Sequence, residues 1–410
     1  MNILYIAYSC SPYAGSEDKI GWSVPFESAK TNRVVVITKE EQRADIEDFL
    51  RKNPDANIEV YYADIPKIYK KIFKGFLYSG RLNLWHKQAL VLAKKYCAQH
   101  PIDVIHQVTP VEFRAIGDYF RISDVKFVCG PLGGGESIPK GLKDYAQGHR
   151  MVEMIRGIAN GWCRLKIKLS RKLDRCDAVM FANKETREYL SGASCRYKTA
   201  ELFSEIGLRA DELKDNDFAN HTAPKCRFLS AGRMIYRKGY DFLLDALERL
   251  PDDLNYEFYI LGDGPELVHL RKRCADSEKL AQKVVFLGTI PYAKMEEAYG
   301  SANVFVMPSI RETTGTVLVE AMSKGLPVIT MDGFGGALLL NEQSGWLYQG
   351  DDKESYLEAM KKNLELCIRE TEMVRCKGRA ARLAAESHTW SQKIQHYQEI
   401  YKQITNRSEG

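Results

Sequence analysis

The sequence lacks the patterns of several common protein classes. No apolar run in its 410 residues approaches the ~18 residues that a membrane-spanning helix needs. Its ten cysteines are scattered and include no Cys-x2-Cys pair. The first apolar run, residues 3–7, is short and follows no basic segment, so we expect a strand there and not a signal peptide. Together these absences favour a reducing, cytoplasmic compartment.

The charge of the chain also narrows the choice of partners. Its net charge of +5 at pH 7 is only mildly basic. No zinc finger, aromatic ribonucleoprotein motif or long basic tail accompanies that charge. We therefore expect no nucleic-acid partner. Apolar residues make up 45% of the chain, which is ordinary for a globular protein.

Strand and helix patterns alternate through both halves of the chain. The expected strands are residues 2–8, 33–38, 58–62, 103–106, 126–129 and 178–181, then 227–231, 257–261, 284–287, 304–307, 328–330 and 346–347. This alternation predicts an α/β protein with parallel sheets and helices on both faces. The length suits two domains of near-equal size. The polar stretch 208–224 is the expected linker between residues 1–207 and 225–387.

One segment in the second half has the pattern of an anion-binding site. An apolar strand at residues 304–307 is followed by a polar turn with glycine and by helical spacing up to Gly325. Free N–H groups at the start of such a helix favour phosphate. Glu312 and Glu320 flank the turn, and carboxylates accept paired hydrogen bonds from sugar or ribose hydroxyls. Two surface glutamates beside a core helix remain the alternative.

A second strand–turn–helix segment lies upstream, at residues 228–247. Its turn carries Arg233 and Lys238 at the carboxyl end of the expected strand. In an open parallel sheet this end is where ligands bind. The two cations therefore predict a diphosphate clamp, with solvated loop charges as the alternative.

These segments resemble the family 4 (group 1) retaining glycosyltransferases, whose fold is GT-B. The matching pieces occur in the family's order over roughly residues 226–350. They are Gly232-Arg233-x4-Lys238-Gly239, Leu261-Gly262-Asp263-Gly264-Pro265, residues 286–291, Pro308-Ser309, Glu312-x7-Glu320 and Gly325-x-Pro327. A glycine loop at residues 11–17 and a closing helix that opens at Thr389 match more loosely.

The resemblance implies both an architecture and a reaction. It implies two Rossmann-like domains with a cleft between them, and a C-terminal helix, residues 388–405, that crosses back to the first domain. The first domain is expected to serve the acceptor and the second the donor. The reaction is transfer of a hexose-type sugar from a UDP, GDP or ADP sugar to an acceptor hydroxyl, with retention. The acceptor would be a saccharide or lipid-linked sugar in the assembly of cell-surface polysaccharide or glycolipid.

The resemblance also implies roles for single residues. The expected catalytic residues are Arg233, Lys238, Glu312 and His106. In family terms Glu312 holds the donor sugar and Glu320 the ribose. The expected donor-binding residues are Gly15, Ser16, Gly232, Ile290, Thr314, Gly315, Thr316 and Glu320. For Gly15 and Ser16, a plain surface turn is the alternative.

The acceptor side carries more open assignments. His106 ends an expected strand, where it would bind the transferred sugar or steer a proton. Many family members have their histidine two positions later, where this chain has Val108, so a structural histidine is an equal alternative. Nearby polar or cleft-lining candidates are Thr109, Glu112, Arg114 and the glycines Gly133, Gly134 and Gly135. For these glycines a flexible connector is the alternative.

No metal or other cofactor is expected. No Asp-x-Asp pair occurs in a suitable context, and two cations can replace a metal at a diphosphate. Two enzyme alternatives share the fold, a nucleotide-sugar epimerase and a sugar phosphorylase. A non-catalytic, transferase-like subunit is the third alternative, although no expected donor-site residue is missing.

One basic and aromatic segment predicts peripheral contact with an anionic membrane. Its cations and aromatic residues are Lys67, Tyr69, Lys70, Lys71, Phe73, Lys74 and Phe76. On a helix they would face lipid headgroups. A second basic run, residues 164–175, lies in the same half. Solvated helix faces are the alternative, and Gly75 and Gly80 weaken the helix prediction.

Overall fold

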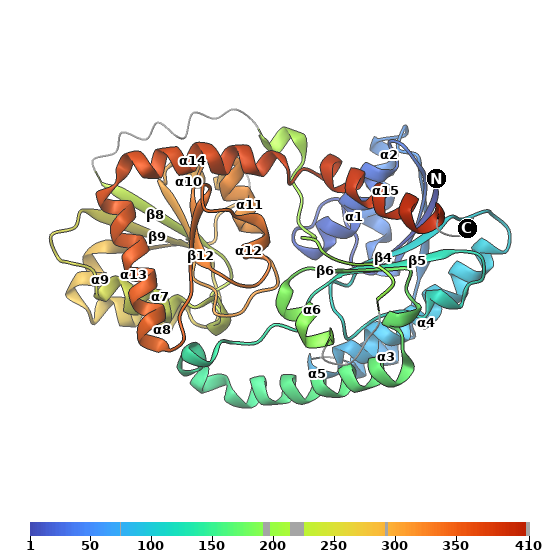
Figure 1. The fold of residues 1–410 in the computed structure, drawn as a ribbon, viewed down its shortest axis with the longest axis horizontal. Helices are drawn as coiled ribbons and strands as arrows, with labels where there is room; N and C mark the ends of the chain where they lie inside the picture. Colours follow the sequence, from blue (N-terminus) through green and yellow to red (C-terminus); the bar gives the residue numbers. More distant parts are fainter. Residues whose placement is uncertain (74, 192–196, 214–224, 292–293, 407–410) are drawn as a thin grey trace. The chain divides into compact units, whose positions relative to one another are not determined.

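The computed structural model describes all residues except 74, 192–196, 214–224, 292–293 and 407–410 (Figure 1). The chain divides into two compact units. Unit 1 contains Met1–Gly135, Glu153–Gly207 and Trp390–Gly410. Unit 2 contains Glu136–Val152 and Leu208–Thr389. Each unit is built around a parallel sheet, as the alternation of strands and helices predicted.

The described residues of unit 1 form a seven-stranded sheet of order β3-β2-β1-β4-β5-β6-β7. Its strands are β1 Asn2–Ala7, β2 Arg33–Lys39, β3 Ile58–Ala63, β4 Val104–Thr109, β5 Lys126–Leu132, β6 Ala178–Phe181 and β7 Ala200–Leu202. Its helices are α1 Glu17–Ser28, α2 Arg43–Lys52, α3 Lys67–Ile72, α4 Tyr78–Cys97, α5 Arg150–Ser170, α6 Lys184–Ser191 and α15 Trp390–Asn406. Successive residues of β1 enter opposite cores: Leu4 joins one cluster and Tyr5 the other. The sheet is thus buried on both faces.

The described residues of unit 2 form a six-stranded sheet of order β10-β9-β8-β11-β12-β13. Its strands are β8 Cys226–Ala231, β9 Tyr256–Leu261, β10 Val284–Gly288, β11 Val304–Met307, β12 Val328–Met331 and β13 Gly345–Tyr348. Its helices are α7 Tyr240–Glu248, α8 Leu267–Ala275, α9 Glu278–Lys283, α10 Met295–Gly300, α11 Thr316–Ser323, α12 Gly336–Leu339, α13 Lys353–Arg369 and α14 Thr371–Glu386. A two-way capping box between Asp352 and Ser355 begins α13.

The strands expected from the sequence are confirmed, with shifts of at most three residues at their ends. The sequence pattern missed β7, because a strand of three residues is too short to show a period of two. The predicted helix after β3 is interrupted: α3 ends at Ile72, and Gly75 adopts φ 55°. In the described ranges, no helix combines the length and apolar character needed to cross a bilayer.

The domain division departs from the predicted boundaries in one segment. Residues 136–152 pack with unit 2 and not with residues 1–135. The reason is apolar: Ile138, Leu142 and Ala146 are buried in the main core cluster of unit 2. Of the predicted linker, residues 214–224 lie outside the described residues. Leu208, at its start, donates its N–H to the carbonyl of His388 at 2.9 Å.

Candidate functional site

The candidate site lies in unit 2, at the carboxyl ends of the neighbouring strands β8 and β11. The chain leaves β8 towards β9 on one side and leaves β11 towards β12 on the other, so this is the switch point of the sheet. The loop after β11 bonds to the loop after β8. Both N–H groups of Ile310 and Arg311 donate to the carbonyl oxygen of Arg237, at 3.0 and 3.2 Å. The two predicted strand–turn–helix segments therefore meet.

An ion-paired cluster joins the two loops. Lys238 Nζ donates a hydrogen bond to Glu312 Oε2, and Arg237 Nη1 lies 3.5 Å from Glu312 Oε1. The Lys238 and Glu312 side chains are only 15% and 11% exposed. Burial alone would raise the pKa of the Glu312 carboxyl, but Lys238 and Arg237 outweigh it and lower the pKa below its usual value. Glu312 is therefore ionised at neutral pH.

Arg233 and Gly232 occupy the same turn, at the start of the loop after β8. Arg233 is exposed, and within the described ranges it has no ion-pair partner. The N–H of Gly232 donates to the carbonyl of Leu261 at 3.0 Å, which fixes the turn against β9. Gly262 follows with φ 127°, and a Cβ there would collide with the carbonyl of Gly232. The glycine motif at residues 261–265 thus permits the close approach of the two turns.

The helix that follows the second loop presents its N-terminus at the same edge. Gly315 is the N-cap of α11 with φ 99°, and it has no side chain with which to cap the first turn. Thr314 is buried, and Thr316 is the first helical residue. One turn further on, Glu320 Oε2 accepts a hydrogen bond from Tyr299 Oη at 3.1 Å. The helix start therefore adds partial positive charge beside Lys238 and Arg237.

Two residues of this cluster were not predicted. Arg237, next to Lys238, could have been found as a third cation of the turn. Glu136 is buried, and its Oε1 accepts a hydrogen bond from Thr313 Oγ1 at 3.3 Å. It ends the glycine-rich loop at residues 130–136, and only the pairing of segments 177 residues apart places it in this site.

Ile290 is the remaining donor-binding candidate of unit 2. It follows β10 and is half-buried. Because β10 runs parallel to β9 and β8, its carboxyl end lies at the same edge of the sheet as the clustered charges. Residues 292–293, just beyond it, lie outside the described residues.

His106 does not fit the predicted catalytic role. It is fully buried in β4, and both ring nitrogens are used. Nε2 donates to the carbonyl of Gly130 at 2.7 Å, and Nδ1 accepts from Tyr401 Oη at 2.6 Å. Burial lowers its pKa to about 4, so the ring is neutral at pH 7. These contacts favour the structural alternative, in which His106 joins β4, β5 and α15.

Thr109 and Arg114 also have hydrogen-bond or ion-pair partners within unit 1. Thr109 is fully buried, and its Oγ1 donates to the carbonyl of Ser9 at 2.8 Å and accepts from the Ser9 N–H at 3.1 Å. The Thr109 hydroxyl both donates to and accepts from the backbone of Ser9, which argues against the expected acceptor role of Thr109. Arg114 pairs with Glu112, with both side chains partly exposed. This pair stays a candidate for acceptor contact.

Hydrogen bonds within unit 1 hold two of the glycines after β5, Gly133 and Gly134. The carbonyl of Gly133 accepts from the Phe113 N–H at 3.1 Å. The carbonyl of Gly134 accepts from Arg156 at 2.8 Å and from Asn160 at 3.1 Å. These bonds anchor the loop, which is therefore no flexible connector.

Gly15 and Ser16 lie in an exposed loop before α1. A Cβ at Gly15 would meet nothing within 4 Å, and Ser16 has φ 55° without a side-chain cap bond. Neither residue has a contact that marks it as a ligand group. Their assignment to the donor stays a prediction.

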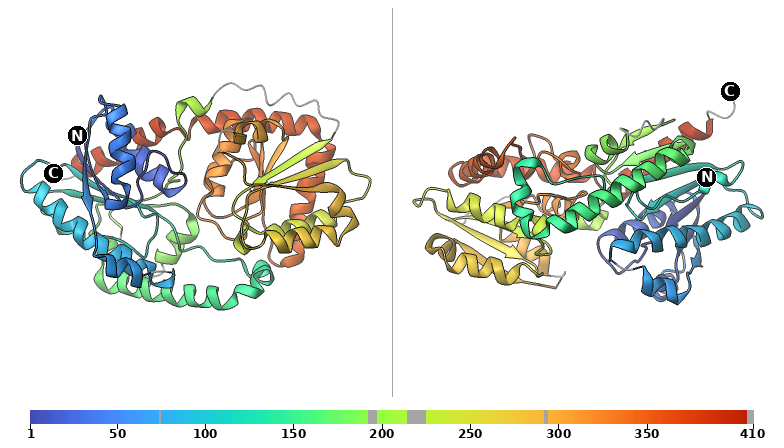
Figure 2. Two further views of the ribbon diagram at one scale, coloured as in Figure 1. Left: turned by 180° about the vertical axis from the view of Figure 1, so that it is seen from behind. Right: turned by 90° about the horizontal axis from the view of Figure 1, so that it is seen from below.

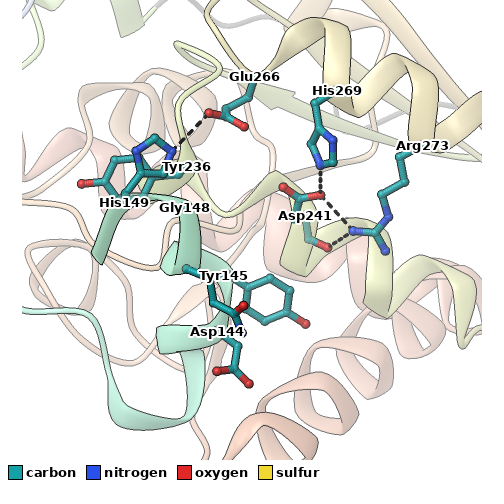
Figure 3. A pocket seen from close by; sticks show the side chains of 10 residues that line it. Asp144, Tyr145, Gly148, His149, Tyr236, Asp241, Glu266, His269 and Arg273 are labelled. Atoms are coloured by element: carbon teal, nitrogen blue, oxygen red, sulfur yellow. Dashed lines mark hydrogen bonds and ion pairs between the residues drawn. The ribbon is translucent and has the colours of Figure 1, made fainter. Parts of the chain in front are cut away.

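A separate pocket of unit 2, of about 440 Å³, borders the Tyr236–Lys238 turn (Figure 3). The His149 ring stacks on the Tyr236 ring with centroids 4.0 Å apart, and His149 Nε2 lies 3.4 Å from Glu266. On the other side Asp241 accepts from Arg273 and pairs with His269, each at 3.0 Å. These pairs help to hold the Tyr236–Lys238 turn, while Asp144, which is exposed and also lines the pocket, takes part in neither of them.

The membrane prediction for the segment after β3 is corrected at one lysine. Lys70 lies 2.9 Å from Glu41 and 2.5 Å from Asp64, so its charge faces the protein. Lys67 and Lys71 are exposed. Lys74 lies outside the described residues.

Comparisons with known proteins agree with this geometry. Residues 214–379 match the family model described as glycosyl transferases group 1. A sulfoquinovosyl transferase of Arabidopsis thaliana is 31% identical over 187 residues, 45% of this chain and 34% of the relative. A lipopolysaccharide core biosynthesis glycosyltransferase of Rhizobium meliloti is 30% identical over 137 residues, 32% of this chain and 37% of the relative. Each match thus spans only about a third of the relative's length.

Solved structures match over nearly the whole chain. A sucrose-phosphate synthase from Thermosynechococcus elongatus covers 99% of both chains with a TM-score of 0.65 and 17% identity. Anabaena HepE, solved with UDP and glucose, covers 97% of this chain and 99% of its own, with a TM-score of 0.62 and 16% identity. These likenesses establish the GT-B fold. The expected resemblance to group 1 glycosyltransferases is confirmed over residues 214–379.

Proposed function

We propose that this chain, with its group 1 glycosyl transferase region on a GT-B fold, transfers a sugar from a nucleoside-diphosphate donor to an acceptor hydroxyl. The observation that carries the proposal is the cluster at the switch point of unit 2. Arg237 and Lys238 pair there with Glu312, Arg233 lies in the same turn, and α11, which carries Glu320, begins four residues after Glu312. Three cations and a helix start suit a diphosphate, and two carboxylates suit hydroxyl groups.

On binding, the donor diphosphate would replace Glu312 as the partner of Lys238. In the structure Lys238 is bonded to Glu312. A bound phosphate offers Lys238 a more highly charged partner, and the Glu312 carboxylate is then free to accept hydrogen bonds from donor-sugar hydroxyls. The low pKa of Glu312 keeps it an acceptor at neutral pH. Lys238 and Glu312 would thus remain paired with each other until the donor binds.

The charge that develops on the leaving diphosphate is the main catalytic demand. Once the donor is bound, Lys238, Arg233 and the first N–H groups of α11 would already be in place when this charge develops. Their positions would therefore lower the barrier to bond cleavage. We propose that these groups replace a metal ion. Following the family resemblance, the acceptor attacks from the side that the diphosphate leaves, with retention, and a phosphate oxygen takes its proton.

The nucleoside half of the donor would lie along α11. Glu320 Oε2 accepts a hydrogen bond from Tyr299 Oη, which positions the carboxylate, and carboxylates accept paired hydrogen bonds from diols such as the ribose hydroxyls. Of the similar structures, the Anabaena protein was solved with UDP and glucose. We therefore propose a UDP sugar as the first donor to test. The sulfoquinovosyl and lipopolysaccharide relatives support a glycolipid or cell-surface polysaccharide as product.

Ligand-induced stabilisation is the direct test of the donor site. A ligand at 100 times its Kd stabilises the folded state by about 2.7 kcal/mol, which raises the melting temperature. We expect one of UDP, GDP or ADP to raise it in the wild type and not in a Lys238→Ala, Glu312→Ala variant. No shift with any of the three, or equal shifts in both proteins, contradicts the proposed site.

Product analysis tests the reaction. Incubation of the donor with saccharide acceptors should give a glycoside whose anomeric proton coupling in NMR matches that of the donor sugar. Sugar release that requires inorganic phosphate identifies a phosphorylase instead. Conversion of the donor without an acceptor to another nucleotide sugar identifies an epimerase.

A further inference from the structure

Helix α5 of this chain is apolar on the face that points away from the protein. Six of its large apolar residues have exposed fractions from 45% to 74%: Met151, Met154, Ile158, Trp162, Leu165 and Leu169. They recur every three or four residues, so they form one stripe along the helix. At about 1.5 Å per residue the stripe is roughly 27 Å long.

The opposite face of α5 is the one that packs on the protein. Asn160 and Ile167 are buried there, and Asn160 donates to the carbonyl of Gly134. A surface helix normally buries its apolar stripe and exposes its polar face. On α5 the apolar stripe is exposed instead, and the polar Asn160 lies on the buried face. In the view from below in Figure 2, no other described element of unit 1 lies in front of α5.

Basic residues border the stripe. Helix α5 contains five arginines and lysines and one glutamate. Lys166 and Lys168 are exposed and, within the described ranges, have no ion-pair partner. At about 100° per residue they lie on opposite sides of Leu165 and Leu169. Two unpaired cations therefore flank the apolar stripe.

We propose that α5 lies on an anionic membrane surface and docks the protein to it. The apolar stripe would enter the boundary between headgroups and acyl chains, and Lys166 and Lys168 would contact anionic headgroups. Trp162, at the middle of the stripe, is a side chain that favours this boundary. The charge pattern favours this occupant, because a second copy of α5 would bring five further cations and only one glutamate to the contact. The inference is independent of the donor site.

Vesicle flotation tests the proposal. The probes are vesicles of phosphatidylcholine alone and of phosphatidylcholine with 30% phosphatidylglycerol, added to the full-length protein. We expect the wild type to float with the anionic vesicles at least fivefold more than with the neutral ones. An Ile158→Gln, Trp162→Gln, Leu165→Gln variant and a Lys166→Glu, Lys168→Glu variant should each lose that excess. A control with Val268→Gln and Leu383→Gln, both exposed apolar residues on α8 and α14, should keep it.

Tryptophan fluorescence gives an independent measurement. The chain has five tryptophans, and the other four, Trp22, Trp85, Trp346 and Trp390, are buried. Trp162 is 64% exposed, so a blue shift of emission on adding anionic vesicles reports its transfer out of water. A Trp162→Phe variant should float like the wild type and show no shift.

Two outcomes overturn the proposal. One is equal flotation of the wild type and the triple glutamine variant. The other is a wild type that fails to float but forms dimers in sedimentation that the triple variant abolishes, which assigns the stripe to a second copy. Melting temperatures close to wild type, measured for each variant, show that a loss of flotation is not a loss of folding.

Discussion

The switch points of the two sheets make an instructive pair. In unit 1 the loops after β1 and β4 are joined by hydrogen bonds that bury their polar groups. Thr109 is bonded to Ser9, and the N–H of Val111 donates to Glu17 Oε1 at 2.5 Å. In unit 2 the loops after β8 and β11 are joined by the ion pair of Lys238 with Glu312, with Arg233 exposed beside it.

The two switch points differ in the charges that surround their carboxyl groups. At the unit 1 switch point, desolvation raises the pKa of Glu17, as for a carboxyl that spends its hydrogen-bonding capacity on the protein. At the unit 2 switch point, cations lower the pKa of Glu312 and keep a dense set of charges at the sheet edge. The same sheet topology therefore carries an edge of buried hydrogen bonds in unit 1 and a charged edge in unit 2, where we propose that the donor binds.

The largest expected effect on turnover comes from removing the cations of unit 2. Lys238→Ala and Arg233→Ala should each lower turnover at least about tenfold, roughly 1.4 kcal/mol of transition-state stabilisation, because each faces the charge on the leaving diphosphate. Steady-state rates with the true donor measure this. Arg271→Ala on α8 is the matched control, since Arg271 is exposed and lies away from the switch point. Rates near wild type for both variants would contradict a catalytic role for these cations. The charged edge of unit 2 would then be structural, like the hydrogen-bonded edge of unit 1.

A histidine substitution tests the structural assignment in unit 1. The pKa of His106 is about 4 in the folded protein and about 6.5 unfolded, so between these values the unfolded state binds a proton that the folded state does not. Stability is therefore complete above about pH 6.5 and falls as the pH drops towards 4, by on the order of 3 kcal/mol. In His106→Phe this fall should be smaller, and stability at pH 7 should be lower by about 1–3 kcal/mol because Tyr401 and Gly130 lose their partner.

Urea unfolding at several pH values measures the His106 effect. His86, whose pKa burial lowers to about 3, gives a fall of the same sign, so the fall is reduced and not abolished. Turnover per folded molecule should stay near wild type. A large loss of turnover with unchanged stability would restore the catalytic prediction for His106.

A smaller effect separates two glycines at the two switch points. Gly315 has φ 99°, and a Cβ there would lie 2.7 Å from Met307 Sδ. Gly315→Ala should destabilise the protein by about 1 kcal/mol, since a side chain is disfavoured at positive φ. Gly15→Ala is the matched control, because a Cβ there meets nothing within 4 Å. Equal melting temperatures for the two variants would contradict the structural demand on the α11 N-cap.

The smallest expected effect is that of a chelator. If the three cations of unit 2 supply the charge that a metal would supply, EDTA should change turnover by less than about twofold. Assays with and without EDTA, then with added Mg²⁺ or Mn²⁺, measure this. Loss on chelation with recovery on metal addition would show that the cationic edge is insufficient.

Much of the unit 2 site could be predicted because its determinants are local. In residues 226–247 and 304–325 a strand, a turn and a helix follow one another, so each turn places its charges at a strand's carboxyl end without information from elsewhere. Arg233, Lys238 and Glu312 follow from that logic. In unit 1 the same logic placed His106 at a strand end, but β4 continues to Thr109, so His106 lies within the strand, where helix α15 packs against it.

Short-range periodicity in the sequence was enough to predict most of the strands, the order of the motifs and the residues that share each helix face. What each face packs against could be seen only in the folded chain. Tyr401 reaches His106 across 295 residues, and Thr313 reaches Glu136 across 177. The same holds for α5: the spacing of Met154, Ile158, Trp162 and Leu165 is that of a core helix, and packing of the opposite face turned that stripe outwards. Periodicity defines a face, but its direction depends on contacts between residues far apart in the chain.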